Sequence, residues 1–223
     1  MKKAYFITGT DTGVGKTLVA CALLQAFIKQ GKKAVGMKPV VAGSMETPAG
    51  LCYEDVENLL AAGNVAAPRE LINPYALTLS IAPHIASAQM GVDIRLEKIE
   101  QSCLKLREMA EVVVVEGVGG FMVPLNDRED TADMAQLLGL PVIMVVGLRL
   151  GCLNHALLSA QEIRRRGLTL AGWVANKIDP DMLFAQDNIV ALEQRLKAPL
   201  IGTVPYGKGL SAEEVARLLR TDF

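Results

Sequence analysis

The stretch Gly9-Thr10-Asp11-Thr12-Gly13-Val14-Gly15-Lys16-Thr17 decides how this chain folds. It follows the apolar run at residues 4–7 and precedes a segment whose apolar residues recur at helical spacing. A glycine-rich turn between a strand and a helix presents backbone N–H groups and the positive end of the helix dipole to an anion. We therefore predict a phosphate-binding loop, in which Lys16 reaches the β- and γ-phosphates of a nucleotide and the Thr17 hydroxyl holds Mg²⁺.

The loop is a variant of the common phosphate-binding motif, because five residues rather than four lie between Gly9 and Gly15. A chance Gly-Lys-Thr in an ordinary loop is the alternative. The strand-like run before the loop and the helical spacing of Val19, Leu23 and Phe27 after it favour the phosphate-binding interpretation.

Length and composition fit one α/β domain over residues 1–223, and two small domains are the less favoured alternative. The chain is 51% hydrophobic but only 4% aromatic, so its core must be built mainly from Val, Leu, Ile and Ala. Such a core suits a parallel sheet buried between helices. The net charge of −1, without a basic block, argues against a nucleic-acid partner.

The sequence also bears on where the protein works. No apolar run approaches the roughly 20 residues that a membrane helix needs, and residues 1–3 lead into a strand without a secretory signal. The chain has two histidines and four scattered cysteines, Cys21, Cys52, Cys103 and Cys152, so no zinc site is expected. We therefore predict a cytoplasmic protein with reduced thiols and no membrane partner.

Strand-like runs alternate with helical patterns along almost the whole chain. Strands are predicted at residues 4–8, 34–38, 112–116, 142–147, 170–176 and 200–204, and their continuous apolar character indicates burial on both faces. Helices are predicted at residues 16–30, 54–62, 96–110, 132–138, 153–166, 184–196 and 212–219. This alternation predicts an α/β, P-loop NTPase-like fold: a doubly wound, mostly parallel sheet with helices on both faces.

Two segments need a separate interpretation. Residues 45–90 contain four prolines, and we interpret them as an excursion of loops and short helices that covers the substrate.

Arg164, Arg165 and Arg166 close a predicted helix, where they complement the helix dipole. A nucleic-acid-binding patch is the alternative for these arginines.

Charged residues follow two strands, at the edge where such sheets bind ligands. Lys38 ends the second predicted strand, where it could join Lys16 in stabilising charge on a transferring phosphoryl group; a solvated surface lysine is the alternative. Glu116 follows four valines and is placed to bind Mg²⁺. The glycine-rich stretch 117–120 then lets the backbone approach a ligand closely.

Two further strand ends could border a nucleotide base. Asn176-Lys177-Ile178-Asp179 matches the N-K-x-D pattern with which some proteins read guanine, but an asparagine there can equally hydrogen-bond adenine. Pro205-Tyr206-Gly207 is placed to border the same base. Asp55, at the start of a predicted helix, is either a second Mg²⁺ ligand or an acid that stabilises the helix dipole.

Five motifs, in order along the chain, together resemble the ATP-dependent dethiobiotin synthetases. They are residues 9–17, Lys38-Pro39-Val40, Val115-Glu116-Gly117-Val118-Gly119-Gly120, Leu150-Gly151-Cys152-Leu153-Asn154-His155-Ala156 and Gly172-Trp173-Val174-Ala175-Asn176. The resemblance runs from near residue 5 to near residue 207, and the extra residue in the phosphate loop is the form that this family carries.

The resemblance implies a ligase of biotin biosynthesis and its small-molecule substrates: ATP, CO₂ and diaminopelargonate (7,8-diaminononanoate). One amine becomes a carbamate, ATP phosphorylates the carbamate to a carbamic–phosphoric anhydride, and the second amine closes the cyclic urea. The products are dethiobiotin, ADP and phosphate.

The resemblance also implies which residues do the work. Lys16, Lys38 and Thr17 would be catalytic, with Lys38 contacting carbamate and γ-phosphate. Thr17, Asp55 and Glu116 would hold Mg²⁺. The nucleotide would be bound by Gly13, Val14, Gly15, Lys16, Thr17, Leu18, Glu116, Gly117, Val118, Gly119, Asn176, Lys177, Pro205, Tyr206 and Gly207.

The family is a homodimer with substrate near the subunit interface. Gly151, Cys152, Leu153 and Asn154 would therefore face the carboxylate of the partner's substrate through a helix N-terminus.

One position departs from the family pattern. The family often carries a hydroxyl where this chain has Ala42, in Val41-Ala42-Gly43-Ser44. We expect that substrate contact to be absent or to come from Ser44 or water, at a cost on the order of 1 kcal/mol in substrate binding.

Three other protein classes fit the sequence less well. A partitioning or positioning ATPase shares the fold, but its loop usually carries an additional lysine where this chain has Asp11. The synthetase half of a cobyrinate-type amidotransferase would need a glutaminase domain, for which the chain is too short. A dinucleotide dehydrogenase would need a G-x-G-x-x-G at the first helix, which is absent.

Overall fold

The computed structural model describes residues 2–48, 50–207 and 209–222. Within them, a six-stranded sheet has the order β10-β9-β8-β1-β7-β2, and every neighbouring pair runs parallel. Its strands are β1 (Lys3–Gly9), β2 (Ala34–Met37), β7 (Val112–Glu116), β8 (Val142–Leu148), β9 (Leu170–Lys177) and β10 (Leu200–Val204). The predicted doubly wound, parallel α/β fold is confirmed.

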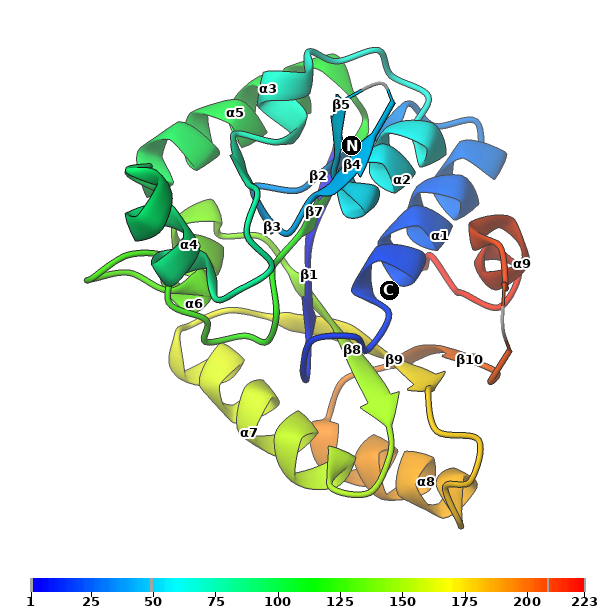
Figure 1. Cartoon of the computed structure of the whole chain (residues 1–223). Coiled ribbons are helices and arrows are strands. Elements are labelled where there is room, and N and C mark those ends of the chain that lie inside the picture. Colours follow the sequence, from blue (N-terminus) through cyan, green and yellow to red (C-terminus); the bar gives the residue numbers. More distant parts are fainter. Residues whose placement is uncertain (1, 49, 208, 223) are drawn as a thin grey trace.

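Helices cover both faces of this sheet (Figure 1). One face packs against α1 (Lys16–Lys29), α2 (Glu54–Ala62) and α9 (Ala212–Ala216). The other packs against α5 (Leu96–Met109), α6 (Thr131–Leu138), α7 (Cys152–Arg165) and α8 (Ala185–Leu196). Among the described residues, no helix is long and apolar enough to cross a membrane.

The strands are apolar throughout because each strand contributes side chains to the hydrophobic core on both faces of the sheet. Val112 and Val114 pack into the cluster around α1, whereas Val113 and Val115 pack into the cluster around α5 to α8. Successive strand residues point to opposite faces, so a strand buried on both sides needs an apolar residue at every position.

Residues 45–90 are more ordered than predicted. Besides α2, they contain the hairpin of β4 (Met45–Thr47) and β5 (Gly50–Cys52), the helices α3 (Arg69–Ile72) and α4 (Pro83–Met90), and β6 (Tyr75–Leu77), which pairs in parallel with β3 (Val40–Ala42). The prediction of loops and short helices missed these strands, because three residues are too few to show a periodic pattern.

Element ends also differ from the predictions. The second strand ends at Met37, which leaves Lys38 just beyond it, while β9 extends through Lys177. The last helix ends at Ala216 rather than residue 219. Phe184 precedes α8 as a left-handed cap with φ 53° rather than forming its first turn.

The three arginines at the end of α7 are engaged within the fold, which counts against the nucleic-acid-patch alternative. Arg164 donates to the Leu196 carbonyl, and Arg165 pairs with Glu162. Arg166 pairs with Asp133 of α6, with Glu162 at 2.8 Å and with Asp130 at 3.6 Å. Hydrogen bonds from Arg165 and Arg166 lower the pKa of Glu162 to about 2. Arg166 therefore ties α6 to α7.

We expect Arg166→Met to lower the free energy of unfolding by about 1–3 kcal/mol, because it leaves half-buried carboxylates without their cation. The matched control is Arg165→Met. Its side chain is 67% exposed and pairs with Glu162 only, so its loss should change the free energy of unfolding much less. Urea denaturation measures both, and equal losses would show that the link between α6 and α7 is not special.

Candidate active site

The phosphate-binding loop is shaped by two glycines. Gly13 and Gly15 have φ of 75° and 89°, a left-handed conformation that side chains other than glycine rarely adopt. A Cβ at Gly15 would also lie 2.3 Å from Asn176 Nδ2. The loop can therefore wrap tightly between β1 and α1 only with glycine at these positions.

Lys16 lies over this loop. Its Nζ donates to the Asp11 carbonyl at 2.9 Å, and the side chain is buried. Burial, together with the nearby charge of Lys38, lowers the Lys16 pKa to about 8, although Glu116, Asp55 and Asp11 partly oppose this shift. An ammonium group held away from water in this way gains strongly from a phosphate partner.

Lys38 lies at the centre of a cluster of charged groups from separate elements. Its Nζ is 2.7 Å from Asp55 Oδ2, in the first turn of α2, and 2.6 Å from Glu116 Oε1, at the end of β7. Burial opposes the charge on Lys38, but the two carboxylates outweigh it and raise the Lys38 pKa. The prediction that Lys38 points into the site therefore fits better than the surface-lysine alternative, since Lys38 is only 2% exposed.

The pKa values of the Glu116 and Asp55 carboxylates shift in opposite directions. Burial raises the pKa of Glu116, and the charge of Lys38 offsets this only in part. Burial also opposes the charge on Asp55, but Lys38 and the Thr17 hydroxyl outweigh it and lower the Asp55 pKa.

The same cluster has the oxygen ligands that Mg²⁺ prefers. Thr17 Oγ1 is 2.8 Å from Asp55 Oδ1 and 2.8 Å from Glu116 Oε1. A hydroxyl has a single proton and donates only one of these bonds, so a cation would satisfy the oxygens better. Glu116 Oε2 is buried without a hydrogen-bond partner among the described residues. The residues therefore fit the predicted Mg²⁺, although no group of three or more His, Cys, Asp or Glu side chains suited to a metal occurs in the described chain.

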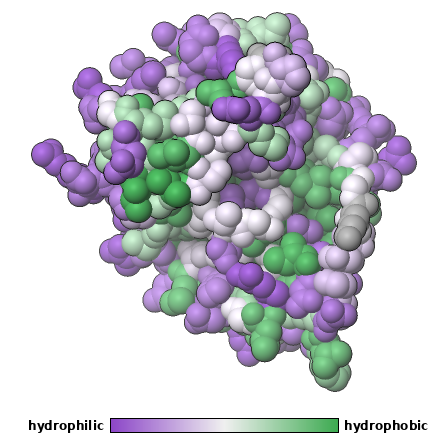
Figure 2. All heavy atoms as spheres, in the orientation of Figure 1, coloured by the Kyte–Doolittle hydropathy of each residue, from purple (hydrophilic) through white to green (hydrophobic). Residues whose placement is uncertain are grey.

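A cleft of about 720 Å³, called the main cleft here, opens over this cluster. Figure 2 shows a hollow near the middle of the view, with hydrophilic atoms inside and hydrophobic residues along parts of its rim. The residues that line the main cleft are Thr12, Gly13, Gly15, Lys16, Thr17, Lys38, Ala42, Asp55, Ser80, Ile81, Ala82, Pro83, Glu116, Val118, Gly119 and Val123. Gly117 does not line it, but its carbonyl accepts from Lys38 Nζ at 3.3 Å.

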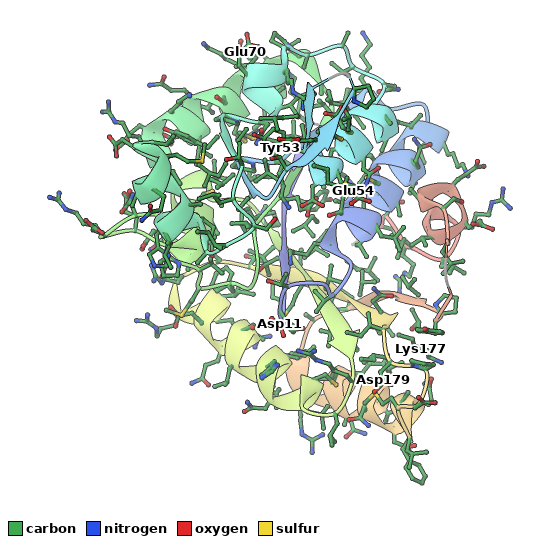
Figure 3. The ribbon with its side chains drawn as sticks, in the orientation of Figure 1. Asp11, Tyr53, Glu54, Glu70, Lys177 and Asp179 are labelled. Carbon is green, nitrogen blue, oxygen red and sulfur yellow. The ribbon has the colours of Figure 1, made fainter. Side chains whose placement is uncertain are left out.

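A second pocket of about 210 Å³, the base pocket, brings together the predicted base-binding residues. Its lining is Leu18, Asn176, Lys177, Ile178, Val204, Pro205, Tyr206, Gly207 and Leu210. Asn176 is also part of the phosphate loop's support, because its Nδ2 donates to the Val14 carbonyl at 2.8 Å. In Figure 3, Lys177 lies at the end of β9 and Asp179 just past it, and Asp11 lies near the middle of the view.

Residues 151–154 are not brought to the main cleft of the same chain. Gly151 caps α7 with φ 95°, Gly151 and Asn154 are exposed, Leu153 is half-buried and Cys152 is buried. Leu150 beside them is 95% exposed. Their predicted role toward substrate would therefore require a second subunit.

The sequence analysis missed several residues of the site. Ser80, Ile81, Ala82 and Pro83 form a wall of the main cleft, and no periodic pattern marks them. Arg149, which pairs with Asp11 of the phosphate loop, follows β8 directly. Inspecting the end of every predicted strand would have found Arg149.

Position 42 lines the main cleft as an alanine, as the sequence analysis expected. The candidate replacement Ser44 does not line this cleft. Its Oγ donates to the Thr78 carbonyl at 3.3 Å, and it faces a neighbouring side pocket of about 240 Å³.

Comparisons with known proteins agree with this geometry. A family model described as "AAA domain" matches residues 3–214. The chain is 55% identical over 219 residues to the ATP-dependent dethiobiotin synthetase BioD of Nitrosospira multiformis, covering 98% of this chain and 95% of that protein. It is 53% identical over 218 residues to the protein of the same name from Aromatoleum aromaticum, with 98% and 97% covered.

Solved structures show the same fold at low identity. The septum site-determining protein MinD of Pyrococcus horikoshii, complexed with Mg-ADP, has a TM-score of 0.59 at 14% identity, with 97% of this chain and 93% of MinD covered. The cell division protein FtsY of Thermotoga maritima has a TM-score of 0.53 at 17% identity, with 96% and 64% covered. Whereas these likenesses concern the fold alone, the full-length identity to the dethiobiotin synthetases shows that this chain belongs to the ATP-dependent dethiobiotin synthetase family.

Proposed function

We propose that this chain catalyses the ATP-dependent ring closure of 7,8-diaminononanoate with CO₂ to dethiobiotin, releasing ADP and phosphate. The observation that carries the proposal is the cluster of Lys16, Lys38 and Thr17 with two carboxylates in the main cleft, in a chain 55% identical to dethiobiotin synthetases. The match over residues 3–214 supports a single synthetase domain.

The chemistry begins with a carbamate, a weak nucleophile that must be held against the γ-phosphate. Lys38 Nζ is buried and faces the main cleft, where it would contact the carbamate oxygens and the phosphoryl group. Phosphorylation places charge on the γ-phosphoryl oxygens, and the ammonium groups of Lys16 and Lys38 would stabilise that charge. The second amine then attacks the carbamic–phosphoric anhydride, forms the C–N bond of the cyclic urea and expels phosphate.

Thr17, Asp55 and Glu116 would hold Mg²⁺, which when bound supplies further positive charge to the phosphates. The backbone N–H groups of the loop from Gly13 to Leu18 would bind the phosphates. Val118 and Gly119, which line the main cleft, and Gly117 would border the transferring group.

The base pocket would take adenine, which Asn176, Lys177 and residues 205–207 would border. Asn176 Nδ2 already donates to the loop, so its Oδ1 is the atom better placed to accept from the adenine amino group. The guanine alternative loses support, since guanine has a carbonyl at that ring position.

A homodimer completes the proposal. Gly151, Cys152, Leu153 and Asn154 lie outside the main cleft of their own chain, so they would meet the partner's substrate at a subunit interface. A cytoplasmic location is part of the same proposal, and all four cysteines being free fits a reducing compartment.

The switch-ATPase alternative shares the fold with MinD, but Asp11 does not favour it. Asp11 pairs with Arg149 and its carbonyl accepts from Lys16. That class usually carries an additional lysine at this position of the loop, whereas this chain has a carboxylate paired with Arg149.

The direct test incubates the purified chain with ATP, Mg²⁺, bicarbonate and 7,8-diaminononanoate. We expect dethiobiotin, detected by mass spectrometry, only when all four are present. ATP hydrolysis that persists without the diamine, and no dethiobiotin, would instead favour a switch ATPase.

We expect Lys16→Gln and Lys38→Gln each to lower turnover by at least about a hundredfold, the scale for losing a group that stabilises transition-state charge. Initial rates of dethiobiotin formation at saturating substrates measure the effect. Lys33→Gln, a change of an exposed lysine just before β2, is the matched control and should leave turnover unchanged. Near-normal turnover in either cleft variant would remove that lysine from the mechanism.

Glu116→Ala should raise the Mg²⁺ concentration needed for half-maximal turnover by about tenfold or more, because it removes one of the proposed ligands. Far-ultraviolet circular dichroism should show an intact fold. Glu70→Ala is the control, since Glu70 is exposed and lies at the outer edge of the molecule in Figure 3. If Glu116→Ala unfolds the protein, Glu116 is structural and the metal assignment fails.

A further inference from the structure

The wall of the main cleft formed by residues 80–83 has a polar end and an apolar end. Ser80 lines the main cleft together with Lys38, Ala42 and Asp55, and it also lines the side pocket. Ile81, Ala82 and Pro83 continue the wall with apolar surface. A substrate with a polar reacting end and an alkyl chain matches this order.

Ser80 lies three residues beyond β6, against the backbone of Gly43, which follows β3. Gly43 donates its N–H to the Leu77 carbonyl at 2.9 Å, directly after the register pair Ala42 and Leu77. A Cβ on Gly43 would lie 2.4 Å from Ser80 Oγ, so the glycine makes room for the serine hydroxyl against its backbone. The hydroxyl of the exposed Ser80 therefore lies over the Gly43 backbone, next to Ala42 in the chain.

The Ser80 hydroxyl has no hydrogen-bond partner within the described part of the chain. The nearby Ser44 hydroxyl is engaged by the Thr78 carbonyl, and Ala42 offers only a methyl group. Two other residues that line the main cleft carry hydroxyls: Thr12 belongs to the phosphate loop, and Thr17 bonds Asp55 and Glu116. Among the residues that line the main cleft, Ser80 is thus the one outside the phosphate loop that carries a hydroxyl.

We propose that Ser80 is a substrate-binding residue, whose hydroxyl donates a hydrogen bond to the carbamate formed on the diamine and holds it beside Lys38. This inference rests on the proposed function. It assigns to Ser80 the contact that Ala42 cannot make, in place of Ser44 or water. The alkyl chain then runs along Ile81, Ala82 and Pro83, where apolar burial favours it.

A neutral hydroxyl suits this position better than a third cation. The main cleft already holds the ammonium groups of Lys16 and Lys38, and a further cation there would be repelled by both. A serine donor orients a carbamate oxygen without competing for the phosphate charge. Ser80 therefore helps to select the diamine, while Lys16 and Lys38 stabilise the charge of phosphoryl transfer.

The test compares Ser80→Ala with Ser44→Ala, which removes the neighbouring hydroxyl of the side pocket. Steady-state assays give KM for diamine and for ATP separately. Isothermal titration gives the diamine Kd in the presence of Mg²⁺, bicarbonate and a non-hydrolysable ATP analogue. We expect Ser80→Ala to raise KM and Kd for the diamine about five- to tenfold, the loss of one hydrogen bond, with KM for ATP unchanged. Ser44→Ala should change neither.

The decisive experiment moves the hydroxyl from position 80 to position 42. Ala42→Ser added to Ser80→Ala should bring the diamine KM back to within about twofold of the unaltered chain, since either position would serve the same group. Ser80→Cys, which keeps the volume but donates weakly, should behave like Ser80→Ala and covers the case in which the alanine variant folds poorly.

The outcomes separate the inference from the function on which it rests. If the unaltered chain forms no dethiobiotin, the proposed function itself fails. If it forms dethiobiotin and Ser80→Ala and Ser80→Cys bind the diamine as tightly as it does, the assignment of Ser80 is overturned. An equal loss in Ser44→Ala, or no rescue by Ala42→Ser, would also overturn it.

Discussion

The buried ammonium group of Lys38 is the interaction on which the site depends. A charge that is 2% exposed is tolerated only if opposite charges surround it, and here Asp55 and Glu116 lie 2.7 and 2.6 Å away. Because the three residues come from α2, from the end of β7 and from the residue after β2, this pairing fixes how those elements meet. The charged groups of the site are therefore brought together when these elements pack against one another.

The parallel sheet explains why these groups meet at one edge. Parallel strands end on the same side, so residues after β1, β2, β7 and β9 converge without long connections. The phosphate loop follows the strand that lies between β7 and β8, which places Lys16 next to the end of β7. Asn176 then links the two pockets, since its amide supports the loop from the end of β9.

The sequence predicted well what depends on local pattern. Continuous apolar runs located all six strands of the main sheet, and the Gly-Lys-Thr motif predicted the glycine-rich turn between β1 and α1 that lines the main cleft. It could not predict what depends on pairing between distant short segments. The β3–β6 pair has three residues a side, so neither its register nor the position of Ser80 leaves a mark in the sequence. Asp55 remained ambiguous for the same reason, because a helix-capping acid and a site acid look alike before Thr17 and Lys38 are placed beside it.

The division between charged and neutral groups in the main cleft follows from its electrostatics. Burial and, after it, the charge of Lys38 lower the Lys16 pKa to about 8, and the carboxylates of Glu116 and Asp55 partly oppose this shift. Any further selectivity for substrate must come from groups that add no charge. The wall of residues 80–83 offers only a hydroxyl and apolar surface. In the proposed function, phosphoryl transfer depends on the charged groups and selection of the diamine on the neutral wall, so the wall can change in sequence without disturbing the balance of charges.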